Sequence, residues 1–486
     1  MKLTIARLTL ELVSPLHIGS GLQSADTDAP VVRDAFGDYR IPGSSLAGAL
    51  RAHCGPSLES AWGSAGSENR ASAIEVSDAF LIDWDGTTTL TKRLAGKSVA
   101  FPTFKEIQDH VRIDHANGAA EDGGKFDAEI VPQGTRFRCE LALIERDDSS
   151  TARDAFTCAL HALDTDAIAL GGDVCSGLGL IRVLRDKSTI ATFDLATAAG
   201  LANARNRPAA LDQPAALDAK PTHISARGLS TATATANTVS GSVRIAFRAD
   251  GPLLVGGSQR PSNKSDADRN FGADLVFGEA RVADYDKKAL VAKPWIPGSS
   301  LRGAIRHRVW HVFEALGCED VQRRMDDLFG SVADKRASAS KIRVTGQFLE
   351  QHPRTLVQHV AIDRLTGGSL TGALYAEAPI WRDDLVIQVG LTLHGIALDE
   401  AAALTHALID MGIGELAIGG GTRRGNGRLL FDSAEGTAGY EGKAVTFNLE
   451  WNGKSISNAS LPSELQALID ALESANETLV GAAANA

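Results

Sequence analysis

One segment of the chain occurs twice, and this repetition restricts the possible folds more than any other feature of the sequence. A proline–glycine turn, two serines and a run of small and aliphatic residues stand at 41–51 and again at 295–306. A Trp/Phe-Gly-Ser turn, an Arg-Ala-Ser triplet and a His-Val-x-Ile-Asp segment repeat in the same order. Landmarks that recur in one order at a separation of about 250 residues indicate a tandem duplication. The chain is therefore predicted to fold as two similar units.

The length of the chain agrees with two units. Its 486 residues exceed the size of one ordinary domain, and 44% hydrophobic residues suffice for a core in each half. We place the first unit at 1–199 and the second at 239–435. A stretch rich in Ala, Thr, Pro and Ser at 200–238 is predicted to be a surface linker, and 436–486 a C-terminal extension.

Within each half, the order of elements predicts a mixed α+β unit. Residues 3–13 alternate apolar and polar side chains, as in a half-buried strand, and 152–170 and 399–412 have helical spacing. Strands that alternate in this way favour antiparallel sheets. The segment 110–130 contains Asn-Gly and Gly-Gly pairs and is predicted to project from the body.

Targeting and redox features point to the cytoplasm. No apolar run reaches the length of a membrane span, and the N-terminus lacks the features of a signal peptide. The five cysteines form no CxxC pair, which argues against a disulfide framework and a structural zinc site. We expect a cytoplasmic protein without a membrane partner, in which the cysteines are buried thiols.

The charge of the chain gives two opposite indications about nucleic acid. A net charge of −11 counts against a phosphate-rich partner. Binding depends on local fields, however, and arginines gather in the second half, at 302–308, 323–324 and 423–428. The composition is therefore compatible with a basic groove on an acidic body.

Each proline–glycine turn is predicted to begin a helix whose first turn attracts an anion. The paired serines offer N-cap hydroxyls, and the free backbone N–H groups at a helix start favour negative charge. In the second copy Arg302 and Arg306 add positive charge one and two turns into the helix. The serines concerned are Ser44, Ser45, Ser299 and Ser300.

A glycine-rich loop near the end of the second half, 419–427, is another candidate anion site. It lacks the ending of a P-loop, and it runs from helix to strand, opposite to a dinucleotide-binding turn. Its glycines permit close approach, and Arg423 and Arg424 suit a phosphate; the alternative is a helix C-cap with solvated arginines. The first copy has Asp173 to Ser176 at this place, and we expect it to bind anions less well.

Two aspartates follow the first glycine turn, in a loop without a core pattern. Carboxylates there can orient a metal or polarise a nucleophile, but exposed loop aspartates without a function are the commoner case. On spacing alone, Asp26 and Asp28 therefore stay undecided. His17 lies at a strand end and is expected to be structural, and no Ser/His/Asp or HExxH motif occurs.

Taken as an ordered set, the repeated motifs resemble the RAMP (repeat-associated mysterious protein) superfamily. The set comprises the turn at 16–21, the Pro-Gly-Ser-Ser turn, Leu-Phe-Gly at 328–330 and the late glycine loop. The resemblance is to backbone subunits of type III CRISPR effector complexes, here with two such units fused. It implies a ferredoxin-like or RRM-like fold in each unit, with protruding thumb hairpins at 110–130 and 359–377. It also implies CRISPR RNA, target RNA and other effector subunits as partners.

The resemblance further implies a site for RNA cleavage. In catalytic members a loop aspartate supports metal-dependent attack of a 2′-hydroxyl on the neighbouring phosphate; Asp28 matches this aspartate, with Asp26 as the second choice. Asp28 would then bind a divalent metal, Mg²⁺. The second copy has a longer loop without Asp-x-Pro, so a second endoribonuclease site is left open, with Asp274 as its candidate. The alternative is a scaffold that only holds the guide RNA.

Backbone contacts that read no sequence are expected to hold the guide RNA. We expect the second unit to bind RNA more strongly and the first to be the surer place of cleavage. The predicted RNA-binding residues are Gly19, Ser20, Gly21, Ser44, Ser45, Arg51, Ser299, Ser300, Arg302, Arg306, Gly420, Gly421, Thr422, Arg423 and Arg424.

Overall fold

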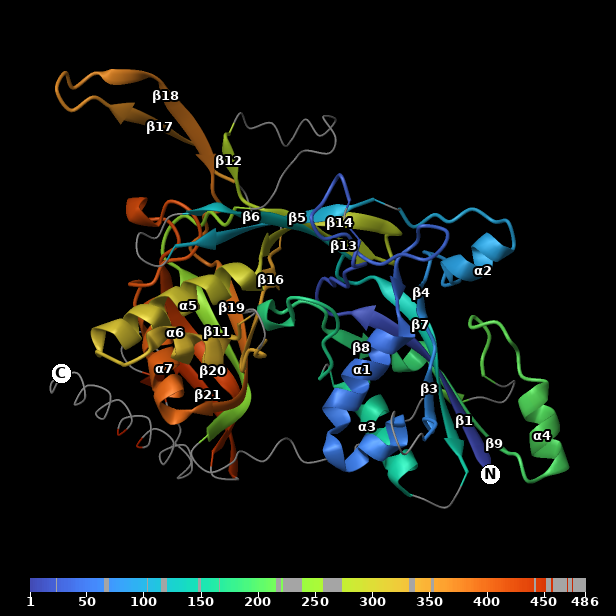
Figure 1. The fold of residues 1–486 in the computed structure, drawn as a ribbon. Coiled ribbons are helices and arrows are strands. Elements are labelled where there is room, and N and C mark those ends of the chain that lie inside the picture. Colours follow the sequence, from blue (N-terminus) through green and yellow to red (C-terminus); the bar gives the residue numbers. More distant parts are fainter. Residues whose placement is uncertain are drawn as a thin grey trace.

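The chain forms two lobes that lie side by side, each built from a sheet and helices (Figure 1). No helix among the described residues is long and apolar enough to cross a membrane. The computed structural model describes residues 1–451 except 23, 65–69, 103, 115–119, 147–149, 166, 216–219, 222–237, 257–272, 332–336, 351–353 and 441–442, and beyond them 456–457, 470 and 474.

The first lobe has a β-α-β-β-α-β core, the order of the ferredoxin-like fold. Its central strands lie in the order β8, β1, β7, β3, and all neighbours are antiparallel. Helices α1 and α3 pack together on one face of this sheet and bury the main core. The elements are β1 (Lys2–Leu12), α1 (Gly43–Cys54), β3 (Ile74–Val76), β7 (Arg136–Glu145), α3 (Ser150–Asp164) and β8 (Ile181–Val183).

The second lobe repeats this order, and the predicted α+β fold of two tandem units is confirmed. Its central strands lie in the order β20, β11, β19, β15, with α5 and α7 packed on the sheet. Strand β21 (Lys443–Trp451) continues the sheet, followed by β22 (Ile456–Ser457). The repeated elements are β11 (Thr238–Ala249), α5 (Gly298–Ala315), β15 (Ile342–Thr345), β19 (Val386–Ala397), α7 (Leu398–Gly412) and β20 (Leu429–Tyr440).

The first sheet is covered on its second face as well, so the prediction of a half-buried opening strand is wrong. Strand β1 is buried from Thr4 to Leu10 because residues that the sequence placed in a linker pack onto it. Arg7, only 4% exposed, pairs with Glu140 and donates to backbone carbonyls within 208–213. The covering residues are those of α4 (Ala198–Arg205) and the segment up to 215, whereas β9 (Thr189–Asp194) and β10 (Lys220–Pro221) extend the sheet at its edge.

A β-hairpin projects from each lobe, where the thumbs were expected. The first is β5 (Glu106–Ile113) with β6 (Ala120–Ile130), and the second is β17 (Val357–Ile362) with β18 (Ser369–Ala378). Figure 1 shows the first thumb running toward the second lobe, while the second thumb points away from the first lobe.

A further hairpin connects the lobes. Strands β13 (Glu279–Asp284) and β14 (Ala289–Ile296) leave the second unit and contact the first, and Gln133 pairs with Val282. A small separate core there joins both units and contains Ile130, Leu178, Ala280 and Trp295. The remaining elements are β2 (Arg40–Ile41), β4 (Ala79–Leu81), α2 (Thr89–Leu94), β12 (Leu275–Val276), α6 (Val321–Phe329) and β16 (Gln347–Phe348).

The cysteines are free thiols, and the prediction of burial holds for three of them. Cys54, Cys139 and Cys158 are buried, whereas Cys175 and Cys318 are half-buried. Burial raises the pKa of the Cys139 thiol to about 12, which keeps it protonated at neutral pH.

Candidate nucleic-acid interface and paired aspartate sites

Asp28 lies in an exposed loop that is tied to the base of the first thumb. The backbone N–H of Asp28 donates to Asp127 Oδ1 at 2.9 Å, and that of Asp127 donates to Asp28 Oδ2 at 3.1 Å. The next residue, Ala29, forms a parallel bridge with Ala128 of β6. These reciprocal bonds hold two carboxylates at one place on the surface. The sequence reasoning missed Asp127, which belongs to a strand and carries no local signal.

Asp274 occupies the equivalent place in the second unit. Its N–H donates to the carbonyl of Ala376 at 2.8 Å, and its Oδ2 accepts from the N–H of Ala376 at 2.8 Å. The following strand β12 pairs in parallel with β18, as Ala29 pairs with β6. The side chain is exposed like that of Asp28, but a methyl group stands where the first unit has the Asp127 carboxylate.

Asp26 points to a different partner. Its Oδ2 lies 2.7 Å from Lys105 Nζ, and the hydrogen bond and charge of Lys105 lower the pKa of this exposed carboxyl. Asp266 and Asp268, also in the longer second loop, lie outside the described residues.

The two aspartate sites offer few ligands for a metal. No group of three or more His, Cys, Asp or Glu side chains that could hold a metal ion occurs among the described residues. Mg²⁺, however, is often bound by one or two carboxylates, with waters and phosphates completing its shell. Asp28 with Asp127 fits this mode, whereas Asp274 supplies one carboxylate.

A histidine stacks on an aromatic ring at the base of each thumb. His110 lies 4.9 Å from the Phe126 ring, and His359 lies 4.9 Å from Tyr375. His359 Nε2 is 3.1 Å from Glu377, but the buried His110 Nε2 has no hydrogen-bond partner within the described chain. Burial lowers the pKa of His110, so its imidazole is neutral at pH 7. Both histidines belong to the repeated His-Val-x-Ile-Asp segment, and this repetition is the sequence signal that could have identified them as candidate site residues.

His17 has the structural role predicted for it. Its Nδ1 lies 2.7 Å from the backbone carbonyl of Glu129, at the base of the first thumb. A Cβ on Gly171 would stand 1.9 Å from the His17 carbonyl oxygen, so the late loop of the first unit requires glycine there.

The late loop of the second unit is exposed around its arginines. Thr422, Arg423 and Arg424 form one short 3₁₀ turn between Gly421 and Gly425, both in the left-handed conformation. Arg424 forms an ion pair with Glu377, which is 1% exposed, and its guanidinium stands 5.8 Å from the Tyr375 ring centroid. Arg424 therefore already has a carboxylate partner, while Arg423 and Thr422 face solvent.

The late loop of the first unit has the same turn but is buried at the junction. Ser176 and Gly177 are buried, and a Cβ on Gly177 would stand 2.6 Å from Thr345 Cα. Leu178 joins the small core with Trp295. Ser176 stands where the second loop has Arg424, and burial leaves no room for an arginine there, whereas Cys175, at the place of Arg423, is half-buried.

The helix starts differ from the prediction. Pro42 and Pro297 are the N-cap residues, without side-chain cap bonds, so the serines do not cap the helices. The first N–H of α1 donates to Asp78 Oδ1 at 2.8 Å, which already supplies a negative charge. Gly298 is buried, and a Cβ on it would stand 2.1 Å from the Ser176 carbonyl oxygen. Ser44 is exposed, and Ser45, Ser299 and Ser300 are half-buried.

The predicted arginines of the helices have mixed surroundings. Arg51 pairs with Glu59 at 2.5 Å, and Arg302 donates to the carbonyl of Phe329. Burial lowers the pKa of Arg306, and the charges of Arg302 and of Arg112 on the first thumb lower it further. Arg112, which the sequence reasoning missed, therefore lies near α5.

The first glycine turn lies beside the Asp28 loop. Gly19 pairs with Val31, and the N–H of Ser20 donates to the Pro30 carbonyl at 2.9 Å. Gly21 has φ +72, and a Cβ there would meet nothing within 4 Å. In the second unit, the N–H of Gly420 donates to Leu254 at 2.7 Å, so it is engaged within the protein.

Three comparisons with known proteins found similar proteins. A family model described as the RAMP superfamily matches residues 9–182 and 247–430. The CRISPR system Cms endoribonuclease Csm3 of Methanocaldococcus jannaschii is 28% identical over 200 residues, which cover 36% of this chain and 75% of the relative. A solved chain of the type III-B Cmr-beta complex in its apo state has a TM-score of 0.30 and 17% identity, over 37% of this chain and 96% of that chain. The family model thus covers more than half of the chain, once in each unit, and the chain belongs to the RAMP superfamily.

Proposed function

We propose that the chain is a backbone subunit of a type III CRISPR RNA-guided effector complex, in which it holds CRISPR RNA and cleaves complementary target RNA. Its family and its similarity to an archaeal protein named a CRISPR endoribonuclease support this assignment. The cleavage proposal depends on one observation, the equivalent attachment of Asp28 and Asp274 to the base of each thumb. The partners are CRISPR RNA, target RNA and other effector subunits.

The proposed reaction needs only groups that meet at one phosphate of the target. The 2′-hydroxyl gives its proton to a base or to water and attacks the adjacent phosphorus. The bond to the 5′-oxygen breaks and that oxygen takes up a proton, so a cyclic phosphate and a 5′-hydroxyl result. The role of the chain is to hold the carboxylate in place: the N–H of Asp127 donates to Asp28 Oδ2. Mg²⁺ held by Asp28, with Asp127 as a second ligand, would neutralise negative charge on the phosphate.

The proposed RNA surface combines the glycine turns with the basic groups between the units. Arg112 on the first thumb and Arg302 and Arg306 on α5 lie near one another and suit the phosphates of a guide strand. Arg423, on the exposed second late loop, would add a contact at the far end. Because these groups would contact the sugar-phosphate backbone of the RNA rather than its bases, binding should be independent of the guide sequence.

Target cleavage by the assembled complex tests the two aspartates. We expect Asp28→Asn to remove one cut and Asp274→Asn to remove another, each with a rate loss of roughly 10²–10⁴-fold and with guide binding retained. Asp26→Asn is the matched control, because Asp26 lies in the same loop but pairs with Lys105. An unchanged product pattern in Asp28→Asn would contradict the assignment of that residue.

A scaffold without cleavage is the second candidate, and the single carboxylate at the Asp274 site favours it for the second unit. No described group of three potential ligands surrounds either aspartate. If the scaffold is correct, the wild-type complex binds target RNA and leaves it intact with Mg²⁺ present. Products from wild type that disappear with Asp28→Asn exclude the scaffold.

A further inference from the structure

The hairpin β13–β14, which we call the junction hairpin (residues 279–296), carries a tyrosine that is held by the first unit. The Tyr285 hydroxyl donates to the Ile82 carbonyl at 2.7 Å and accepts from the N–H of Arg136 at 3.1 Å. The Arg136 guanidinium lies over the Tyr285 ring, 4.3 Å from its centroid. Both polar bonds of the tyrosine thus end in the other unit.

Aromatic rings of the first unit complete this receptor. Trp84 meets Tyr285 edge-on at 4.9 Å between ring centroids, and Phe101 stacks on Trp84 at 4.4 Å. We call Ile82, Trp84, Phe101 and Arg136 the socket. Pairs of this geometry stabilise an interface beyond the apolar area that they bury.

A second group of contacts holds the side of the junction hairpin. The N–H of Ala283 donates to the Gln133 carbonyl at 2.7 Å, and Arg281 lies 3.0 Å from Glu106 and over the Phe104 ring. The contacts thus extend along one strand of the hairpin, from Arg281 to Tyr285.

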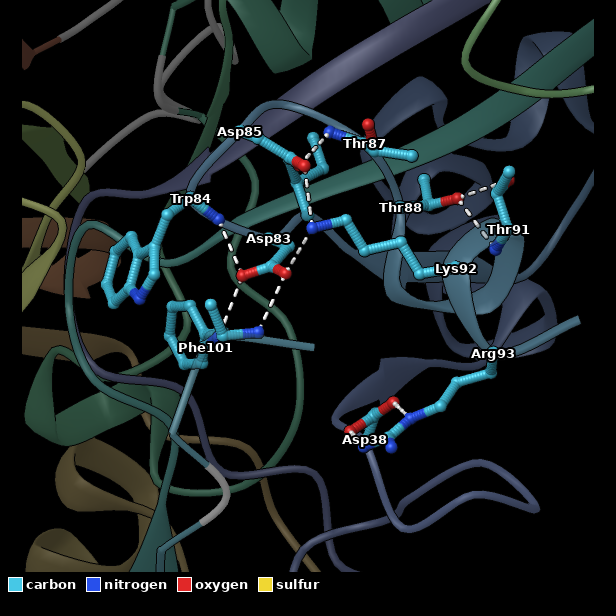
Figure 2. Close-up of polar contacts among 12 residues, drawn as sticks. Asp38, Asp83, Trp84, Asp85, Thr87, Thr88, Thr91, Lys92, Arg93 and Phe101 are labelled. Carbon is cyan, nitrogen blue, oxygen red and sulfur yellow. Dashed lines mark hydrogen bonds and ion pairs between the residues drawn. The ribbon is translucent and has the colours of Figure 1, made fainter. Parts of the chain in front are cut away.

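One buried carboxylate keeps the socket rigid. Figure 2 shows Asp83, which is fully buried and accepts the backbone N–H groups of Trp84 and Phe101, each at 2.7 Å. Lys92 Nζ lies 2.7 Å from Asp83 Oδ2. Burial by itself would raise the pKa of Asp83, but Lys92 and the backbone N–H groups outweigh it and the pKa is lowered. The carboxylate therefore stays charged and holds the backbone of both aromatic socket residues, Trp84 and Phe101.

Among the residues that the structure describes, the socket and the junction hairpin each occur once. The socket rings lie in 82–105, between β4 and β5, whereas only 349–356 separate β16 from β17 in the second unit. In place of the junction hairpin, the first unit has a short turn closed by the bridge between Arg33 and Tyr39. These two additions to the duplicated fold contact each other. Their contact therefore indicates a shared function rather than independent divergence of two loops.

We propose that the junction hairpin in its socket fixes the separation and orientation of the Asp28 and Asp274 sites, with Tyr285 as the positioning residue. The spacing between the two cuts in a target is then set inside one polypeptide. This inference depends on the proposed function, because it assigns a role to the distance between its two sites.

The first test measures the geometry without any reaction. Nitroxide labels are introduced through unnatural amino acids at Gly48 of α1 and Gly303 of α5, where a Cβ meets nothing within 4 Å. Double electron–electron resonance on the full chain should give one narrow distribution of distances between the two labels in wild type. In Tyr285→Ala that distribution should broaden. Asp286→Ala, at the exposed tip of the same hairpin, should retain the narrow distribution. An equally narrow distance in Tyr285→Ala overturns the proposal.

The second test uses target cleavage by the assembled complex. We expect the complex with Tyr285→Ala to cleave at both sites with overall rates close to wild type. The number of nucleotides between its two cuts, however, should vary from product to product. If Tyr285→Ala does not fold, Tyr285→Phe keeps the ring and loses both polar bonds, and it should show a smaller spread. A loosened distance with unchanged product spacing overturns the positioning role. Failure of the proposed function is distinguishable, because a wild-type complex that does not cleave leaves the distance measurement valid.

Discussion

The two late glycine loops have the same backbone and opposite surroundings. Each is a short 3₁₀ turn between two left-handed residues, Asp173 and Gly177 in the first unit and Gly421 and Gly425 in the second. The first loop is covered by the second unit, whereas the second loop exposes Arg423 and Arg424. A duplicated fold thus keeps its turn chemistry, while position in the chain decides whether a loop becomes an internal interface or a surface for a ligand.

The largest effect is expected from one substitution made in both loops. Gly177→Ala should destabilise the protein by about 3 kcal/mol, because its Cβ enters Thr345 and the residue has φ +81. Gly425 has φ +94, but a Cβ there would meet nothing within 4 Å. Gly425→Ala should therefore lower the free energy of unfolding by about 1 kcal/mol. Urea unfolding of both variants measures the difference. Equal losses would mean that the first loop is not held by the second unit.

A smaller effect is expected from the ion pair that attaches the second loop to its thumb. Arg424→Ala leaves Glu377 buried with His359 as its remaining partner, and the free energy of unfolding should fall by about 1–2 kcal/mol. Arg423→Ala, at an exposed neighbouring position, should change stability by less than about 0.5 kcal/mol. Thermal unfolding compares the two arginines, and identical stabilities would contradict the role of Arg424.

RNA binding should reverse the ranking of these arginines. Arg423→Ala removes an exposed charge and should lower the slope of log affinity against log salt by roughly 1. Guide-RNA titrations from low to high salt measure that slope. The first loop has no arginine to remove, so Asp173→Ala is the control, and a slope unchanged in Arg423→Ala would exclude a phosphate contact.

The smallest effect concerns the thumb histidines. Burial lowers the pKa of His110 in the folded protein below 6.5, its ordinary value, so the folded state binds a proton less well than the unfolded chain. Stability should therefore be lost as pH falls below about 6.5, by about 1 kcal/mol or less. Urea unfolding at pH 7.5 and at pH 5.5 measures the fall in the free energy of unfolding between these pH values. This fall should be smaller in His110→Gln than in wild type. The same pH dependence in the variant would contradict the assignment.

Parts of the candidate site could be predicted because the two halves can be compared with each other. The second loop has no Asp-x-Pro motif, yet the Oδ2 atom of Asp274 accepts from a thumb-strand N–H at the equivalent place, as Asp28 Oδ2 does. The predicted serine caps are wrong because Pro42 and Pro297 occupy the N-cap positions, and at α1 the distant carboxylate of Asp78 accepts from the first helical N–H. Asp127 could not be found, since its relation to Asp28 depends on the pairing of a loop with a thumb strand.

The sequence by itself determined that the chain has two α+β units, because turn chemistry and alternating patterns are properties of neighbouring residues and recur in both halves. Only the tertiary structure decided which surfaces of those units are covered. Residues of the expected linker cover the first sheet, the junction hairpin fills the socket, and the first late loop lies beneath the second unit. These contacts join segments distant in the chain, and no local pattern records which distant partner a side chain will meet.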